Sequence, residues 1–135
     1  MNTTDDSSTK IVPKRRGIER LLFTLVNSGR ALRYLLRNEA AFQQELALAC
    51  VLIPVAIFLS TTAVEFALLV GSVIAVLVVE VLNTAIEVVI NRIGLESNAL
   101  SGLAKDLGPA AVTLALILWA VVWGSIVSSY WITRV

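Results

Sequence analysis

The sequence predicts an all-α membrane protein with three transmembrane helices and an N-terminal amphipathic surface helix. Of its 135 residues 57% are hydrophobic and only 16% are charged, and the mean hydropathy is +0.83. The apolar residues form long uncharged runs, which the hydrocarbon layer of a bilayer would cover and a soluble fold of this size would not. We expect one membrane domain over residues 17–135, preceded by a mobile arm at residues 1–16.

Residues 17–37 have the period of a helix with one basic side. Arg30, Arg33 and Arg37 recur at i, i+3 and i+7, and leucines occupy other sides. Each arginine would cost roughly 2.5–3.5 kcal/mol near the centre of a bilayer. We therefore expect this helix to lie in the headgroup plane.

Three apolar stretches predict the helices that cross the membrane. They lie at about residues 39–59, 66–91 and 107–131. Pro54 should kink the first span locally. A short polar turn at residues 60–62 and a longer polar connection at residues 92–106 join the spans, and Pro109 would stand in the first turn of the third.

Basic residues are distributed unevenly, and this distribution predicts the topology. Eight Lys and Arg residues lie in residues 1–39 and two in residues 92–106, whereas the C-terminal tail has only Arg134. Cytoplasmic segments of membrane proteins carry the excess of basic residues. We expect a multi-pass membrane protein whose N-terminus and second connection lie in the cytoplasm and whose C-terminus lies on the opposite side of the membrane.

Several classes of site are excluded by composition. Histidine is absent and Cys50 is the one cysteine, so imidazole metal sites, thiol clusters and internal disulfides are ruled out. Cys50 lies in an apolar run and is interpreted as a packing residue. No P-loop, dinucleotide-binding or protein-kinase motif occurs, and we expect no nucleic-acid partner.

Glu80, Asn83, Glu87 and Asn91 form one polar stripe on the second span, within an arc of about 80°. Two carboxylates in a membrane helix cost several kcal/mol unless they are paired, protonated, metal-bound or beside water. The alternative, hydrogen bonding between helices, normally uses Ser, Thr, Asn or Gln. Oxygen ligands alone favour Mg²⁺, which completes its coordination with water or phosphates and so indicates a nucleotide.

Other charged residues are expected at the same membrane face. Glu39 and Glu45 stand where the first span leaves the cytoplasm, and Lys105 and Asp106 stand before the third. Each alone would be interpreted as a solvated interfacial charge. Because all four are expected at the same membrane face, together they indicate a functional site more strongly than each does alone.

Three motifs, NEAAFQQE (38–45), EVLNTAIEVVINRIG (80–94) and LSGLAKDLG (100–108), resemble those of the prokaryotic integral-membrane diacylglycerol kinases. The resemblance covers roughly residues 18–131. It implies a homotrimeric bundle, surrounded by membrane lipids, whose composite active sites lie at the cytoplasmic interface. The implied reaction transfers the γ-phosphoryl group of ATP, with Mg²⁺, to the free hydroxyl of diacylglycerol, giving phosphatidic acid.

The resemblance also implies roles for single residues. Glu80 would be the base that takes the proton from the lipid hydroxyl, Asn83 would position the base or the lipid, and Glu39 and Glu87 would hold Mg²⁺ on the phosphates. The implied nucleotide contacts are Arg20, Glu39, Glu87, Glu96, Asn98, Lys105 and Asp106. The implied lipid-site residues are Phe42, Gln44, Glu45, Glu80 and Asn83.

Two positions depart from the pattern of the family. Asn91 stands where an aspartate is usual, which puts an ion pair in doubt, and Pro109 stands where a small hydroxyl residue is expected. Two other functions remain open. An undecaprenol kinase of the same superfamily would differ before the first span, where this chain has NEAAFQQE. A non-enzymatic pore would need a path that is polar throughout, which the outer half of the second span does not offer.

Overall fold

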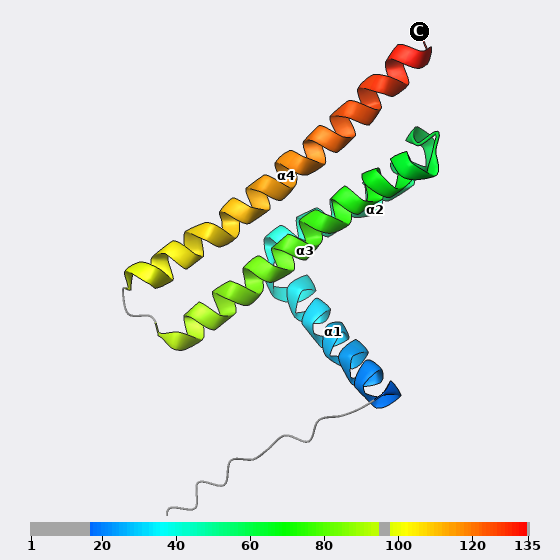
Figure 1. Ribbon diagram of the computed structural model, residues 1–135. Coiled ribbons are helices and arrows are strands. Elements are labelled where there is room, and N and C mark those ends of the chain that lie inside the picture. The colour runs from blue at the N-terminus through cyan, green and yellow to red at the C-terminus, as the bar shows by residue number, and fades with distance from the viewer. Residues whose placement is uncertain (1–16, 95–97, 135) are drawn as a thin grey trace, which may run out of the picture. The chain divides into compact units, whose positions relative to one another are not determined.

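The computed structural model describes residues 17–94 and 98–134, and over these ranges it contains four α-helices and no strand (Figure 1). The helices are α1 (Ile18–Asn38), α2 (Ala40–Leu59), α3 (Ala63–Ile93) and α4 (Ala99–Arg134). The last three are long and apolar enough to cross a membrane, so the all-α membrane class is confirmed. The predicted mobile arm at residues 1–16 lies outside the described residues.

The chain divides into two compact units, Met1–Tyr34 and Leu35–Val135. In the first unit α1 begins after Gly17, whose positive φ of 64° suits a residue without a side chain. Polar groups of this helix are bonded locally: the Thr24 hydroxyl donates to the Arg20 carbonyl at 2.8 Å. Ile18 and Leu25 are largely exposed on the same helix, as an amphipathic helix requires if its apolar side is to meet lipid.

In the second unit the helical backbone is interrupted at Glu39, which is extended (φ −111°, ψ 104°) and is the N-cap of α2. The interruption leaves no backbone group of Glu39 unpaired. Its N–H donates to the Leu35 carbonyl at 3.0 Å and its carbonyl accepts from the Gln43 N–H at 3.1 Å. The Gln43 side chain also donates to the Leu36 carbonyl at 3.1 Å. Glu39 is thus held in place by backbone bonds, and its carboxylate makes no cap bond.

A capping box starts α3 at Ala63, three residues before the predicted start at residue 66. The Thr62 hydroxyl accepts from the Glu65 N–H at 3.2 Å, and the Glu65 carboxylate accepts from the Thr62 N–H at 3.2 Å. The Thr61 N–H donates to that carboxylate at 2.7 Å. Glu65 is charged and so limits the uncharged stretch of the second span to residues from 66 onward. A carboxylate at this position nevertheless belongs to the helix, because it accepts backbone N–H groups at the first turn.

The third long helix begins earlier than the sequence predicts, and the prediction that Pro109 stands in its first turn was wrong. α4 begins at Ala99 and not at residue 107, so the connection is confined to residues 94–98 and Pro109 stands inside the helix. Asn98 explains the early start, because its side-chain oxygen accepts from the N–H groups of Leu100 (2.9 Å) and Ser101 (3.4 Å) as an N-cap does. Charged residues mark the edge of the hydrocarbon layer, but they do not end a helix.

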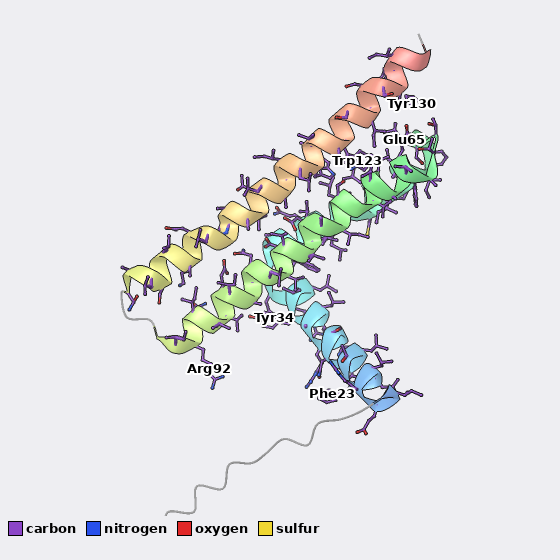
Figure 2. All side chains as sticks on the ribbon, in the orientation of Figure 1. Phe23, Tyr34, Glu65, Arg92, Trp123 and Tyr130 are labelled. Carbon is purple, nitrogen blue, oxygen red and sulfur yellow. The ribbon has the colours of Figure 1, made fainter. Side chains whose placement is uncertain are left out.

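The core of the second unit lies where α3 packs against α2 on one side and α4 on the other. Its buried residues are Ala49, Ala56, Leu69, Val73 and Trp123. Trp123 lies on the side of α4 that faces α3 (Figure 2), and its indole N–H donates to the Leu69 carbonyl at 3.3 Å. The interpretation of Cys50 as a packing residue was wrong: it is exposed, because the small side chain that faces the neighbouring helix is the adjacent Ala49.

Candidate active site

The buried face of α3 changes from apolar to polar along its length. Leu69, Val73, Val76, Glu80 and Thr84 recur at steps of three or four residues, so they share one side of the helix. Glu80 is only 5% exposed. A carboxylate buried in this way beside apolar side chains requires a proton, a hydrogen-bond donor or a cation. The face of α3 that forms the apolar core around Leu69 and Val73 therefore also carries the buried carboxylate of Glu80.

Asn83 and Glu87 lie on the same face of α3 and are half-buried. The Asn83 side-chain nitrogen is 3.5 Å from the Glu87 Oε1 atom, at the outer limit of a hydrogen bond. This contact joins the two side chains across one turn of α3. Asn91, one turn further on, is exposed. The predicted polar stripe thus has three members in the interior and one at the surface.

Helix α2 brings two further carboxylates to this region. Glu80 lies within electrostatic range of Glu39, Glu45 and Glu87. The Glu45 Oε2 atom is buried and has no hydrogen-bond partner among the residues that the structure describes. Glu80 is therefore the centre of an acidic cluster formed with Glu39, Glu45 and Glu87, and a bound cation would relieve the repulsion that acts on Glu80.

The acidic cluster is too sparse to be a closed metal cage. Among residues 17–94 and 98–134, no group of three or more His, Cys, Asp or Glu side chains is arranged to hold a metal ion. Mg²⁺ is usually bound by one or two carboxylates and takes its other ligands from water and phosphates. Glu39, whose carboxylate makes no cap bond, and Glu87, joined to Asn83, fit such a site.

The predicted nucleotide contacts are distributed differently. Lys105 and Asp106 are exposed in the first turns of α4. The Asn98 side chain caps α4, so its carbonyl oxygen is already engaged with the backbone. Glu96 lies outside the described residues. Arg20 belongs to the first unit, and its part in nucleotide binding stays a prediction.

One of the predicted lipid-site residues, Glu45, lines a pocket that is otherwise apolar. Phe42 is 3% exposed and packs in the interior, Gln44 is exposed, and Glu45 is half-buried. The pocket lies between α2, α3 and α4. Its lining residues are Glu45, Leu48, Ala49, Leu52, Val73, Val76, Leu77, Leu116 and Trp119. Glu45 supplies the carboxylate of this pocket, and Val76 of its lining lies one helical turn before Glu80 on α3.

Gly108 belongs to this region although nothing in its residue type indicates a function. It is buried on α4 and faces Asn83 of α3. The signal available in the sequence is slight: a glycine next to a proline inside a helical stretch indicates either a break or a close approach of two backbones. Only the packing of α3 against α4 shows that Gly108 marks a close approach and not a break in the helix.

The chain matches one protein-family model, described as prokaryotic diacylglycerol kinase, over residues 26–127. It is 43% identical over 113 residues to a diacylglycerol kinase of Haemophilus influenzae, covering 84% of this chain and 96% of that protein. It is 42% identical over 107 residues to the diacylglycerol kinase of Escherichia coli K12, covering 79% and 88%. A Pseudomonas aeruginosa diacylglycerol kinase is 46% identical over 90 residues, which cover 67% and 73%.

Proposed function

Because this chain belongs to the prokaryotic diacylglycerol kinase family, we propose that it transfers the γ-phosphoryl group of ATP to the free hydroxyl of diacylglycerol. The products are phosphatidic acid and ADP. The observation that supports this function best is the position of Glu80. It is buried, it has three other carboxylates in electrostatic range, and it follows by one helical turn Val76, which lines an apolar pocket.

The depth of Glu80 suits a lipid hydroxyl. At about 1.5 Å per residue, Glu80 lies about 26 Å along α3 from Ala63, and the hydrocarbon layer is about 30 Å thick. The residue would therefore stand near the headgroup level of the second leaflet. Diacylglycerol has a small, uncharged headgroup, so its free hydroxyl can reach this level while its acyl chains stay in lipid.

Glu80 would act as the base of the reaction. Its carboxylate accepts the proton of the lipid hydroxyl as that oxygen forms a bond to the γ-phosphorus. The bond between the γ-phosphorus and the β–γ bridging oxygen breaks, and ADP leaves. In phosphoryl transfer the protein mainly positions the reactants and neutralises the charge of the phosphates. A few carboxylates and a lysine are therefore sufficient.

Glu39 and Glu87 would hold Mg²⁺ on the phosphates of ATP. A metal ion held there would supply positive charge that offsets the charge of the phosphates. Asn83, whose side-chain nitrogen is 3.5 Å from the Glu87 Oε1 atom, would help to orient the Glu87 carboxylate. Glu45 and Gln44 would meet the glycerol end of the lipid, and Phe42 would support them from the interior. The exposed Lys105 and Asp106, with Arg20, Glu96 and Asn98, would contact the nucleotide.

We propose the orientation and the assembly as well. The excess of Lys and Arg before residue 40 favours a cytoplasmic N-terminus, and three spans then bring the C-terminus to the periplasm. ATP is available in the cytoplasm, so the acidic cluster would lie at that face of the inner membrane. The homotrimer with composite sites is what the resemblance to the family implies, and the exposed apolar surface of the three long helices is available for contact with neighbouring copies.

A direct assay tests the proposed function. The full-length chain is placed in lipid vesicles and given labelled ATP, Mg²⁺ and either diacylglycerol or undecaprenol. We expect label in phosphatidic acid and little in undecaprenyl phosphate. Faster labelling of undecaprenol would establish the polyprenol alternative. A current across the vesicle membrane that is insensitive to ATP, with no lipid labelled, would establish the pore.

A further inference from the structure

α3 and α4 come close together at Gly108, which is buried and lies against Asn83. A methyl group added at its Cα would lie 3.1 Å from the Cγ atom of Asn83 and closer still to the Asn83 Oδ1 atom. Real Cβ atoms do not approach an oxygen that closely. The space beside Gly108 is therefore occupied by the amide of Asn83.

The Asn83 amide has little freedom in this position. Its Oδ1 atom is buried and has no hydrogen-bond partner among the described residues. Its nitrogen points along α3 to Glu87, 3.5 Å from Oε1. The backbone of Gly108 on one side and the Glu87 carboxylate on the other thus determine which way the amide faces.

The backbone conformation does not require a glycine at residue 108. Gly108 is not among the described glycines with a positive φ, and it has ordinary helical geometry inside α4. Glycine is a poor helix former compared with alanine. By contrast, a methyl group at Gly124 of the same helix, or at Gly71 of α3, would meet no atom of the described chain within 4 Å. The absence of a side chain at Gly108 therefore leaves space for the Asn83 amide.

We propose that Gly108 is a positioning residue for phosphoryl transfer: its missing side chain leaves the space in which Asn83 holds the Glu87 carboxylate in its working orientation. This inference rests on the proposed function, because Glu87 is a proposed ligand of the metal that accompanies ATP. A methyl group at residue 108 would push the Asn83 amide away from its place, and Glu87 would lose the group that orients it. Displacements of this size at a catalytic centre cost about tenfold to hundredfold in rate.

The test compares three alanine substitutions in the full-length protein in vesicles. Gly108→Ala should lower kcat for diacylglycerol by about tenfold or more and raise the Mg·ATP concentration needed for half-saturation. Gly124→Ala and Gly71→Ala, which add the same methyl group in open space, should stay within about twofold of the parent. The side-chain amide resonances of Asn83, in protein labelled with ¹⁵N-asparagine and assigned by their loss in Asn83→Ala, report its environment directly.

Gly108→Ala should shift the Asn83 resonances, and the two control substitutions should not. A fall in kcat with unmoved Asn83 resonances, or moved resonances with full activity, would overturn the proposal. If Gly108→Ala does not fold, the double variant Asn83→Ala/Gly108→Ala should fold, because the displaced amide is gone; its failure to fold would also overturn the proposal. A parent without kinase activity would refute the proposed function, while the resonances would still show whether Gly108 positions Asn83.

Discussion

Glu80 is 5% exposed. Burying an ionised carboxylate costs free energy unless a proton, a hydrogen-bond donor or a cation accompanies it. The sequence was sufficient to predict that Glu80, Asn83 and Glu87 share a face, because the rotation of 100° per residue relates side chains within a single helix. Spacing could not show that Glu39 and Glu45 of α2 come within range of Glu80. Nor could it show that Asn83 meets Gly108, since contacts between helices depend on how they pack.

Glu80→Gln tests the assignment of the base. The amide keeps the size of the side chain but cannot accept the proton of the lipid hydroxyl, so kcat should fall by about 10²- to 10⁴-fold. The initial rate of labelled phosphatidic acid formation measures the change. Size-exclusion chromatography of the variant in detergent should give the elution volume of the parent, which separates loss of chemistry from loss of assembly. Full activity would remove Glu80 from the base role.

Glu87→Gln should act on the metal and the nucleotide more than on chemistry. Losing a group that orients a metal ligand costs about 10- to 100-fold in metal affinity, and losing a ligand should cost at least as much. We expect the Mg·ATP concentration for half-saturation to rise by this factor, with a smaller change in kcat at saturation. An unchanged half-saturation with a reduced kcat would contradict the assignment and would place Glu87 nearer the reacting atoms.

At the scale of the helix, the sequence is informative about hydrophobic stretches and less so about where each helix begins. Thr62 and Asn98 begin α3 and α4 earlier than the apolar pattern suggested. Both are side-chain caps, and both are followed by charged residues that still belong to the helix. Hydropathy measures which residues lie in lipid, whereas caps determine which residues are helical, so the two boundaries differ by several residues where a helix extends beyond the bilayer.

Thr62→Ala tests the capping box at the start of α3. The substitution removes the hydroxyl that accepts from the Glu65 N–H, and such a loss destabilises a protein by about 1 kcal/mol. Thermal unfolding in detergent, followed by circular dichroism, should show a lower midpoint for Thr62→Ala and a nearly unchanged midpoint for Thr62→Ser. Kinase activity at low temperature should be unaffected, because Glu80 lies more than four turns away along α3. Equal stability of both variants would show that the cap contributes nothing.

At the scale of the whole molecule, much of the surface is apolar. α4 exposes Leu114, Ile117, Leu118 and Val121, each by more than half of its area. Lipid can cover such residues, and so can a second copy of the chain. The fold class follows from these apolar runs alone, but the number of chains does not, because lipid-facing and protein-facing leucines have the same composition.

The proposed trimer predicts a definite mass. Light scattering of the purified protein, corrected for bound detergent, should give three chains of 14.6 kDa. Dilution into excess detergent should reduce activity together with the trimer fraction if neighbouring copies contribute to each site. A monomer that retains the full rate would show that one chain contains every residue that the reaction needs.

The acidic cluster predicts that the metal and the nucleotide bind together. Glu39 and Glu87 offer too few ligands to retain a divalent ion by themselves, and phosphates would supply the others. Mn²⁺, observed by its electron paramagnetic resonance in place of Mg²⁺, should stay largely free with protein alone and become immobilised when a non-hydrolysable ATP analogue is added. Glu87→Gln should reduce the immobilised fraction, whereas Ser125→Ala on the exposed side of α4 should not. Tight Mn²⁺ binding without nucleotide would mean that the protein itself contains a complete metal site.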